Sequence, residues 1–311
     1  MIPKSLPALT LAALFAAQAS AADKITLMLD WYINPDHAPI MVAEQIGAFK
    51  QEGLEVKIVP PSDPALPPRL VAAGKADLAI TYQPQLHFFA DQGLPLMRVG
   101  TLINSPLNTV MTLDKNITSP ADLRGKKIGY SVSGIEEATL SAMLRQQKLS
   151  TGDVKMINVN FQLTSALLAG QVDAIIGGYR NIEALELELQ GKKPVVLNVE
   201  DYGVPAYDEL IIVANKAEVN QPKIKKFLAA LQKGARYLQA HPEQTWSSFA
   251  SSHPELNTEL NRRAWQKTLP LFARDPAQLD SARYQAYEQF LFDHKLIKKI
   301  TPVSDYAIEI K

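Results

Sequence analysis

The sequence contains no cysteine. This absence excludes disulfides, thiolate-bound metals and nucleophilic thiols. It also excludes attachment to a membrane through a lipid-modified cysteine. The histidines are few and are scattered without the spacing of metal ligands, so we expect no metal site. A phosphate-cradling glycine loop and a glycine-x-serine-x-glycine nucleophile motif are both missing, and we expect no cofactor.

The sequence also lacks an excess of charge of one sign. Lysine plus arginine and aspartate plus glutamate each number 32 among 311 residues. A neutral balance without a basic run argues against nucleic acid or an anionic lipid surface as the partner. With 47% hydrophobic residues and no low-complexity tract, the composition is that of a globular protein.

Long apolar runs are limited to one segment near the N-terminus, residues 6–17. This run is too short to span a bilayer, which takes roughly 20 apolar residues. It follows Lys4 and precedes the small residues Ala19, Ser20 and Ala21. A cation, a short apolar core and a small-residue exit together form a secretory signal. We therefore expect residues 1–21 to be removed and the mature protein to be soluble in a periplasm.

Strand-like and helix-like segments alternate through the first two-thirds of the chain. Residues 24–29, 54–59 and 76–80 have the apolar character of buried strands, and residues 39–50 and 68–73 that of helices. Such alternation predicts an α/β fold with mostly parallel sheets flanked by helices. After Pro222 the pattern is helical to the end, and we expect these helices to form a coat on the first part of the fold.

An internal similarity relates residues 71–80 to residues 167–176. In each copy a helix ends at a glycine, which tolerates the left-handed conformation, and an apolar strand follows after an aspartate. Copies about 100 residues apart are too distant for a solenoid repeat and predict two lobes of similar plan. We expect residues 22–111 plus 211–311 to form lobe 1 and residues 112–210 to form lobe 2. Two crossover hinge strands, at residues 108–113 and 209–214, would join them.

The residues that follow each strand should meet in a cleft between the lobes, because open parallel sheets bind ligands beyond the carboxyl ends of their strands. Trp31, Tyr82 and Tyr179 offer rings for stacking on a ligand, although each also fits a packing role. Glu183 lies one helical turn after Tyr179 and suits an amine, but a glutamate is also typical of a helix N-terminus. The candidate ligand contacts are Asp30, Trp31, His37, Tyr82, Gln83, Asn108, Ser133, Gly134, Tyr179, Glu183, Tyr207, Asp208 and Glu209.

The expected cleft is acidic. It gathers Asp30, Asp36, Glu136, Glu137, Glu183, Asp208 and Glu209, with Arg180 as the only nearby cation. Carboxylates disfavour a sulfonate or nitrate and favour a cationic or amine-bearing ligand. For Asp208 and Glu209 a solvated position at the hinge is an equally simple interpretation.

Three segments resemble the thiamine-pyrimidine family. They are residues 30–39 (Asp-Trp-Tyr-Ile-Asn-Pro-Asp-His-Ala-Pro), residues 82–85 (Tyr-Gln-Pro-Gln) and residues 205–209 (Pro-Ala-Tyr-Asp-Glu). That family joins ABC substrate-binding proteins for thiamine-precursor pyrimidines to the fungal pyrimidine synthase. The resemblance covers nearly the whole mature chain. It implies a two-lobed periplasmic-binding-protein fold (type II-like) that closes on hydroxymethylpyrimidine or formylaminopyrimidine. It further implies a monomer that delivers its cargo to an ABC permease with its ATPase subunits.

Two alternatives to this function stay open at the level of sequence. The glycine-turn segments are shared with nitrate and sulfonate binders, so the ligand could instead be riboflavin, another heterocycle, nitrate or an alkanesulfonate. The other alternative is a pyrimidine-forming synthase. It is disfavoured because the synthase's cofactor-binding lysine and its sacrificed histidine fall at Thr81 and Gln85 here, and its cysteine-rich iron motif has no counterpart. We expect a binding protein and no enzyme.

Overall fold

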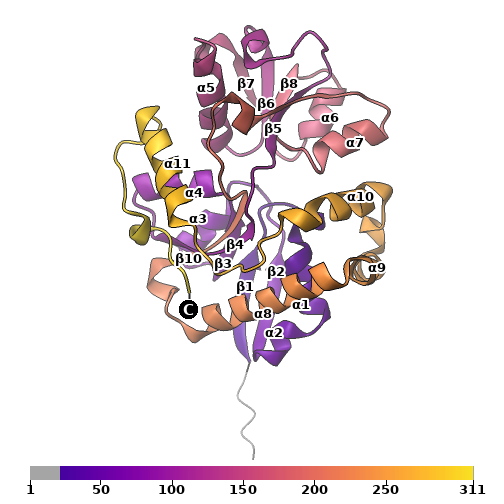
Figure 1. Ribbon diagram of the computed structural model, residues 1–311, viewed down its shortest axis with the longest axis vertical. Coiled ribbons are helices and arrows are strands. Elements are labelled where there is room, and N and C mark those ends of the chain that lie inside the picture. The colour runs from indigo at the N-terminus through magenta and orange to yellow at the C-terminus, as the bar shows by residue number, and fades with distance from the viewer. Residues whose placement is uncertain (1–21, 311) are drawn as a thin grey trace, which may run out of the picture.

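The computed structural model describes residues 22–310 and shows two lobes, each built around a five-stranded sheet (Figure 1). The predicted signal segment, residues 1–21, lies outside the described residues. In lobe 1 the strand order is β2-β1-β3-β10-β4. The strands are β1 (Asp23–Met28), β2 (Leu54–Val59), β3 (Leu78–Thr81), β4 (Leu96–Ile103) and β10 (Leu210–Asn215).

Lobe 2 repeats this plan with the strand order β7-β6-β8-β5-β9. Its strands are β5 (Asn108–Thr112), β6 (Lys127–Tyr130), β7 (Lys155–Asn158), β8 (Ala174–Tyr179) and β9 (Val195–Asn198). In each sheet three neighbouring strands run parallel, and the next strand, which arrives from the other lobe, runs antiparallel to them. The internal similarity in the sequence reflects this plan, and the predicted α/β two-lobed fold is confirmed.

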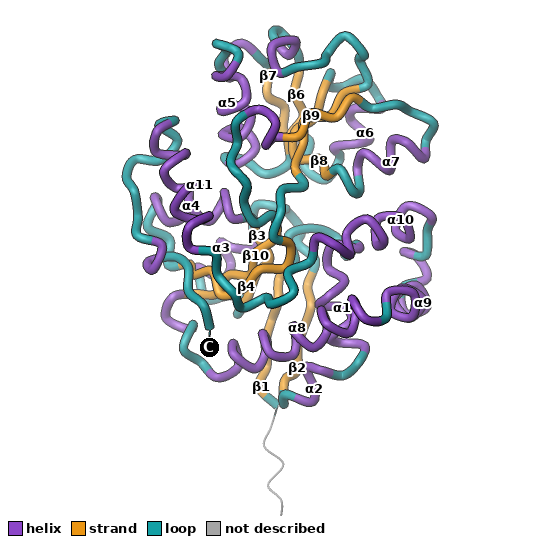
Figure 2. The backbone as a smooth tube through the Cα atoms, in the orientation of Figure 1, coloured by secondary structure: helices purple, strands orange, loops and turns teal. Residues whose placement is uncertain are grey.

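The two crossings between the lobes are short segments rather than strands. The chain leaves lobe 1 after β4 and enters β5 through residues 104–107, and it returns to β10 through residues 203–209 (Figure 2). Strand β5 pairs along its length with β8 and β9 of lobe 2. The expected boundary between residues 111 and 112 therefore runs through a strand, and the strand pairing places this crossing about four residues earlier in the chain.

Helices cover both sheets (Figure 1). Lobe 1 carries α1 (Ala38–Gln45), α2 (Ala48–Gln51), α3 (Pro67–Ala72) and α4 (Gln83–Asp91), and lobe 2 carries α5 (Ile135–Gln146), α6 (Leu163–Leu168) and α7 (Glu183–Leu189). The C-terminal part adds α8 (Pro222–Ala240), α9 (Pro242–Ser252), α10 (Glu259–Thr268) and α11 (Ser281–Asp293). Within residues 22–310, none of the helices has both the length and the apolar character that crossing a bilayer requires.

Helix α8 forms part of the expected coat on lobe 1. Its apolar residues Phe227, Leu228 and Leu231 are buried in the lobe 1 core, as their helical spacing predicts. The helix lies so close to α1 that a Cβ atom on Gly234 would stand 2.5 Å from the carbonyl oxygen of Pro39. Glycine at this position therefore allows the two helices to approach.

Helix α11 corrects the expectation that the C-terminal helices pack only on lobe 1. Tyr284 belongs to a cluster built from α3, α4 and the lobe 1 sheet. Tyr287 and Leu291, one and two turns further along, belong to the lobe 2 core. The helix thus spans the two lobes, because tyrosine and leucine side chains on its inner side reach apolar surfaces of both.

Candidate functional site

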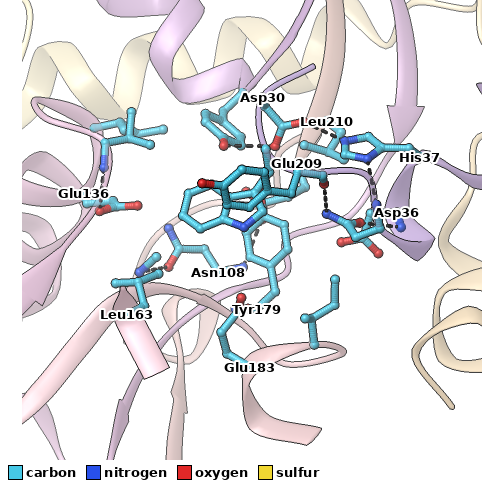
Figure 3. A pocket seen from close by; sticks show the side chains of 18 residues that line it. Asp30, Asp36, His37, Asn108, Glu136, Leu163, Tyr179, Glu183, Glu209 and Leu210 are labelled. Carbon is cyan, nitrogen blue, oxygen red and sulfur yellow. Dashed lines mark hydrogen bonds and ion pairs between the residues drawn. The ribbon is translucent and has the colours of Figure 1, made fainter. Parts of the chain in front are cut away.

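A pocket opens between the lobes, where the carboxyl ends of several strands meet. Lobe 1 contributes the loop after β1 and the end of β3, and lobe 2 contributes the ends of β6 and β8 (Figure 3). Of the predicted ligand contacts, those that line the pocket are Asp30, Trp31, His37, Tyr82, Asn108, Tyr179, Glu183 and Glu209. Their position fits the predicted role, and contact with a ligand stays a prediction.

Asp30 anchors the lobe 1 wall. Its Oδ2 accepts a hydrogen bond from the Tyr82 hydroxyl at 3.0 Å, and its Oδ1 lies 2.9 Å from Nε2 of His37 (Figure 3). The other ring nitrogen of His37 accepts from the backbone N–H of Asn34 at 3.3 Å. Nε2 therefore carries the proton and donates to Asp30. His37 is fully buried, and these two bonds give it a bracing role in the wall.

Aromatic side chains from both lobes meet at the pocket. The Trp31 ring of lobe 1 lies 4.6 Å from the Phe161 ring of lobe 2, at an interplanar angle of 71°. Tyr32 lies against the same Phe161 ring at 4.6 Å. Phe161 stands in the loop between β7 and α6. These rings form an apolar contact across the cleft, and edge-to-face pairs of this kind are favourable beyond simple burial.

Carboxyl groups dominate the polar lining. Oε2 of Glu136 accepts hydrogen bonds from the backbone N–H groups of Ser131 and Val132, at 2.6 and 3.1 Å. Oε2 of Glu183 accepts from the Tyr179 N–H at 2.7 Å. Each carboxyl group is thereby fixed by the backbone of its own lobe, with its position set by the start of a helix.

Glu209 belongs to the second crossing and binds groups from the first. Its Oε2 accepts from the N–H groups of Leu107 and Asn108, at 2.5 and 3.0 Å. The Tyr207 hydroxyl donates to the same oxygen at 3.0 Å, and the Tyr179 hydroxyl donates to Oε1 at 3.2 Å. Glu209 thus ties the two crossings together at the floor of the cleft, which removes the alternative of a solvated hinge residue.

Burial raises the pKa values of these carboxyl groups, because desolvation penalises their charged form. The pKa of Glu136 rises to about 8, that of Glu183 and that of Glu209 to about 7, and that of Asp36 to about 6. Backbone N–H donors oppose the effect at Glu136, Glu183 and Glu209. The groups therefore stand near the balance between protonated and ionised at neutral pH.

No basic side chain of lysine or arginine lines this pocket within residues 22–310. Arg180, the cation expected nearby, instead binds Glu200 through two hydrogen bonds of 2.6 and 2.8 Å and lies outside the lining. The pocket therefore offers acceptors and flat apolar surfaces. Chemically it can hold a planar ligand with hydrogen-bond donors or positive charge, and it is poorly suited to an anion.

Several predicted contacts lie elsewhere. Gln83 accepts from the Asp208 N–H at 2.8 Å, and Asp208 pairs with Arg283 at 2.6 Å behind the crossing. Tyr207 is buried and reaches the site only through Glu209. These side chains pack at the second crossing. Asp208 is buried there, so the alternative of a solvated hinge residue is wrong for Asp208 as it is for Glu209.

Ser133 and Gly134 also lie outside the pocket. They line a separate cavity together with Arg69 and Phe88. Helix α5 begins at Ile135, which borders both cavities. Glu136, the next residue, lines the pocket, whereas the two residues before the helix line only the separate cavity.

Other lining residues were not among the predicted contacts. They are Tyr32, Asn34, Asp36, Val132, Ile135, Glu136, Leu163, Gly177, Ile182 and Leu210. Asp36 and Glu136 carried a signal, because both contribute to the acidity of the predicted cleft. Val132, Ile135 and Gly177 directly follow predicted strands, so their position pointed to the cleft. The other apolar members carried no signal, since an apolar residue has the same sequence pattern in a pocket wall and in a core.

Thr81 and Gln85, the positions at which the family resemblance places the key synthase residues, lie outside this lining. Thr81 and Gln85 are both buried, and the Thr81 hydroxyl donates to the Gln85 side chain. Both side chains are uncharged, and they form a hydrogen bond with one another within the fold. Within residues 22–310, no cluster of histidine, aspartate and glutamate side chains has the arrangement of a metal site.

Comparisons with known proteins agree with this architecture. The family model described as NMT1/THI5 like matches residues 34–245. A Haemophilus influenzae protein named for thiamine biosynthesis is 53% identical over 293 residues, covering 94% of this chain and 93% of that protein. The formylaminopyrimidine-binding protein of Halalkalibacterium halodurans is 33% identical over 259 residues, covering 82% and 78%.

An enzyme is also among the relatives. The 4-amino-5-hydroxymethyl-2-methylpyrimidine phosphate synthase of Legionella pneumophila is 27% identical over 290 residues, covering 89% of this chain and 90% of the synthase.

Solved structures confirm the predicted periplasmic-binding-protein fold. The alkanesulfonate-binding protein of Xanthomonas axonopodis superposes with a TM-score of 0.73 at 17% identity, covering 93% of this chain and 99% of that one. A Candida albicans protein described as having the generic periplasmic binding protein fold superposes with a TM-score of 0.72 at 16% identity, covering 93% and 96%.

Proposed function

Because the chain belongs to the NMT1/THI5-like family, we propose that it is a periplasmic substrate-binding protein for a thiamine-precursor pyrimidine. In this role it binds hydroxymethylpyrimidine or formylaminopyrimidine between its lobes, as a monomer, and delivers it to an ABC permease and its ATPase subunits. The observation that carries the proposal is the pocket itself, which combines aromatic rings with several carboxyl groups and is lined by no lysine or arginine among the described residues.

An aminopyrimidine matches such a pocket in shape and in hydrogen bonding. Its exocyclic amine donates hydrogen bonds, and its ring nitrogen can be protonated. A carboxylate accepts from both, as a charge-assisted pair. Glu183 and Glu136 both line the pocket and offer acceptor oxygens. Trp31 and Tyr179 supply apolar surface for the ring.

The two-lobed architecture supports a role in transport. Open and closed forms exchange through the crossings at residues 104–107 and 203–209. A ligand that contacts both lobes shifts the population towards the closed form. The permease then recognises that form, so delivery depends on the ligand being present.

Two other functions are disfavoured by particular residues. An alkanesulfonate carries a permanent negative charge, which the pocket carboxyl groups would repel. Synthase chemistry of the related enzymes would need groups that Thr81 and Gln85 cannot supply. Formation of a pyrimidine phosphate by purified protein, given pyridoxal phosphate and iron, would restore the enzymatic alternative.

The test is a ligand panel on the purified protein. Native mass spectrometry should find an aminopyrimidine carried through purification. In a thermal-shift panel, aminopyrimidines should raise the melting temperature by mass action, and alkanesulfonates and nitrate should leave it unchanged. If a sulfonate or riboflavin gave the largest rise in melting temperature, the choice of ligand would be overturned.

A further inference from the structure

Asp36 makes a hydrogen-bonded contact between the lobes at the wall of the pocket. It lies in the short η1 helix (Pro35–His37) of lobe 1. Its Oδ1 accepts from Nδ2 of Asn181 at 2.7 Å, and Asn181 belongs to lobe 2. The Thr268 hydroxyl at the end of α10 donates to the same oxygen at 3.0 Å. Asn181 Nδ2 also lies 2.7 Å from that hydroxyl, so the three side chains form one small network.

The second oxygen of Asp36 has no partner. Oδ2 is buried without a hydrogen bond, the residue is only 1% exposed, and Asp36 lines the pocket. A buried carboxylate oxygen without a donor is costly, because it has lost its water and gained nothing in exchange. With Oδ1 committed to Asn181 and Thr268, Oδ2 is the carboxylate oxygen that lacks a donor, in a residue that borders the pocket.

We propose that Asp36 couples the ligand to lobe closure, with Oδ2 accepting a hydrogen bond from the ligand while Oδ1 holds Asn181 of the opposite lobe. This inference rests on the proposed function, which supplies a ligand with N–H donors. Asn181 is outside the pocket lining, so it acts as a positioning residue and not as a ligand contact.

The network explains why a ligand on one lobe stabilises the contact with the other. A donor at Oδ2 favours the ionised form of Asp36, and an ionised carboxylate is a stronger acceptor for the Asn181 amide than a neutral one. Helix α10, which carries Thr268, packs against both η1 and α7. The network therefore lies where the two lobes already touch.

The experiment measures binding kinetics of formylaminopyrimidine to the full mature chain. Asn181→Ala should speed dissociation by roughly tenfold to a hundredfold, the range for loss of a hydrogen bond to a charged group, with little change in the association rate. Asn116→Ala, an exposed asparagine of the same lobe, is the control and should behave as wild type. Small-angle scattering should show less ligand-induced compaction for Asn181→Ala.

A double-mutant cycle separates coupling from a general loss of packing. Asp36→Asn should weaken binding strongly in the wild-type background and much less in the Asn181→Ala background, because residues of one network are not additive. If Asn181→Ala does not fold, Asn181→Asp keeps the size of the side chain and places a like charge against Asp36, and it should weaken binding further.

The outcomes are distinguishable. Multiplicative effects of the two substitutions, or an unchanged dissociation rate in Asn181→Ala, would overturn the coupling while leaving the proposed function intact. Failure of the wild-type protein to bind any aminopyrimidine would overturn both.

Discussion

Trp31 makes its packing contacts across the cleft. It follows a strand of lobe 1, yet its ring packs with Phe161 and with the lobe 2 cluster that contains Leu163. Its side chain therefore joins the two lobes as well as lining the pocket. A tryptophan that only supported its own lobe would pack against the lobe 1 core.

Replacing Trp31 by alanine should weaken pyrimidine binding by at least tenfold. The variant loses the contact of the indole with the pyrimidine and its contact with Phe161, and each aromatic pair contributes roughly 1 kcal/mol beyond burial. Trp31→Phe keeps a ring and should lose less. Calorimetry measures both variants. Unchanged affinity in Trp31→Ala would contradict a role for this ring in binding.

Glu136 shows how the pocket carboxyl groups affect stability. Burial raises its pKa from the ordinary value of 4.5 to about 8, so the folded protein holds this proton more tightly than the unfolded chain does. The stabilisation from that proton is complete below about pH 4.5 and is lost as the pH rises through about 8.

Glu136→Gln should therefore stabilise the ligand-free protein at pH 8.5, by roughly 3 °C or more in melting temperature, and have little effect at pH 4.5. The glutamine oxygen can still accept from Ser131 and Val132. Differential scanning fluorimetry across pH checks this expectation. An equal shift at both pH values would show that the ionisation of Glu136 is not the cause.

At the scale of elements, the end of β8 is shaped to receive Glu136. Gly177 has a φ of +97°, and a Cβ atom there would stand 2.1 Å from a Glu136 carboxyl oxygen. Its N–H donates to the Asn108 side chain at 3.0 Å. The glycine thus lets α5, β8 and β5 meet at one point of the pocket.

Gly177→Ala should abolish tight binding, because the backbone conformation is strained for alanine and Glu136 must move. Gly178→Ala is the matched control. Its φ is ordinary, and its new Cβ meets the flexible ends of Ile175 and Met111 at 3.2 and 3.4 Å and the Cβ of Glu183 at 3.5 Å, which is an ordinary contact distance. We expect that variant to keep most of its affinity in calorimetry, and similar losses in both would argue against the contact with Glu136.

The sequence predicts this architecture at the level of elements and loses detail at their ends. Repeated glycine exits at Gly74 and Gly170 correctly indicate two similar sheets, and strand ends correctly indicate where a pocket forms. The direction in which a single side chain points depends on the residue at which the helix begins. The sequence therefore could not predict that Glu136 lines the pocket while Gly134 lines a different cavity. Contacts between distant segments, such as Asn181 with Asp36, leave no local pattern.

For the whole molecule, α11 is a feature that joins the two lobes. Tyr284 lies in the lobe 1 cluster and Tyr287 in the lobe 2 core, where its ring lies 5.4 Å from that of Tyr207 in the second crossing. The helix lies alongside both lobes (Figure 1). It therefore acts as a third connection in addition to the two crossings.

Tyr287→Ala should lower stability by about 3 kcal/mol, the usual cost of truncating a buried aromatic residue, and should widen the distribution of lobe arrangements in scattering profiles. Gln285→Ala, on the exposed side of the same helix, is the control for helix stability. If Tyr287→Ala unfolds at the same denaturant concentration as Gln285→Ala, α11 does not connect the lobes energetically.

The placement of the tryptophans gives this molecule a built-in optical reporter. The chain has three, and Trp246 and Trp265 pack against one another in lobe 1, at 5.6 Å. Only Trp31 lines the pocket within residues 22–310. Its emission should therefore change when a ring settles beside it or when the lobes part, while the other two provide a constant background. Ligand binding and release can then be followed in real time on unlabelled protein.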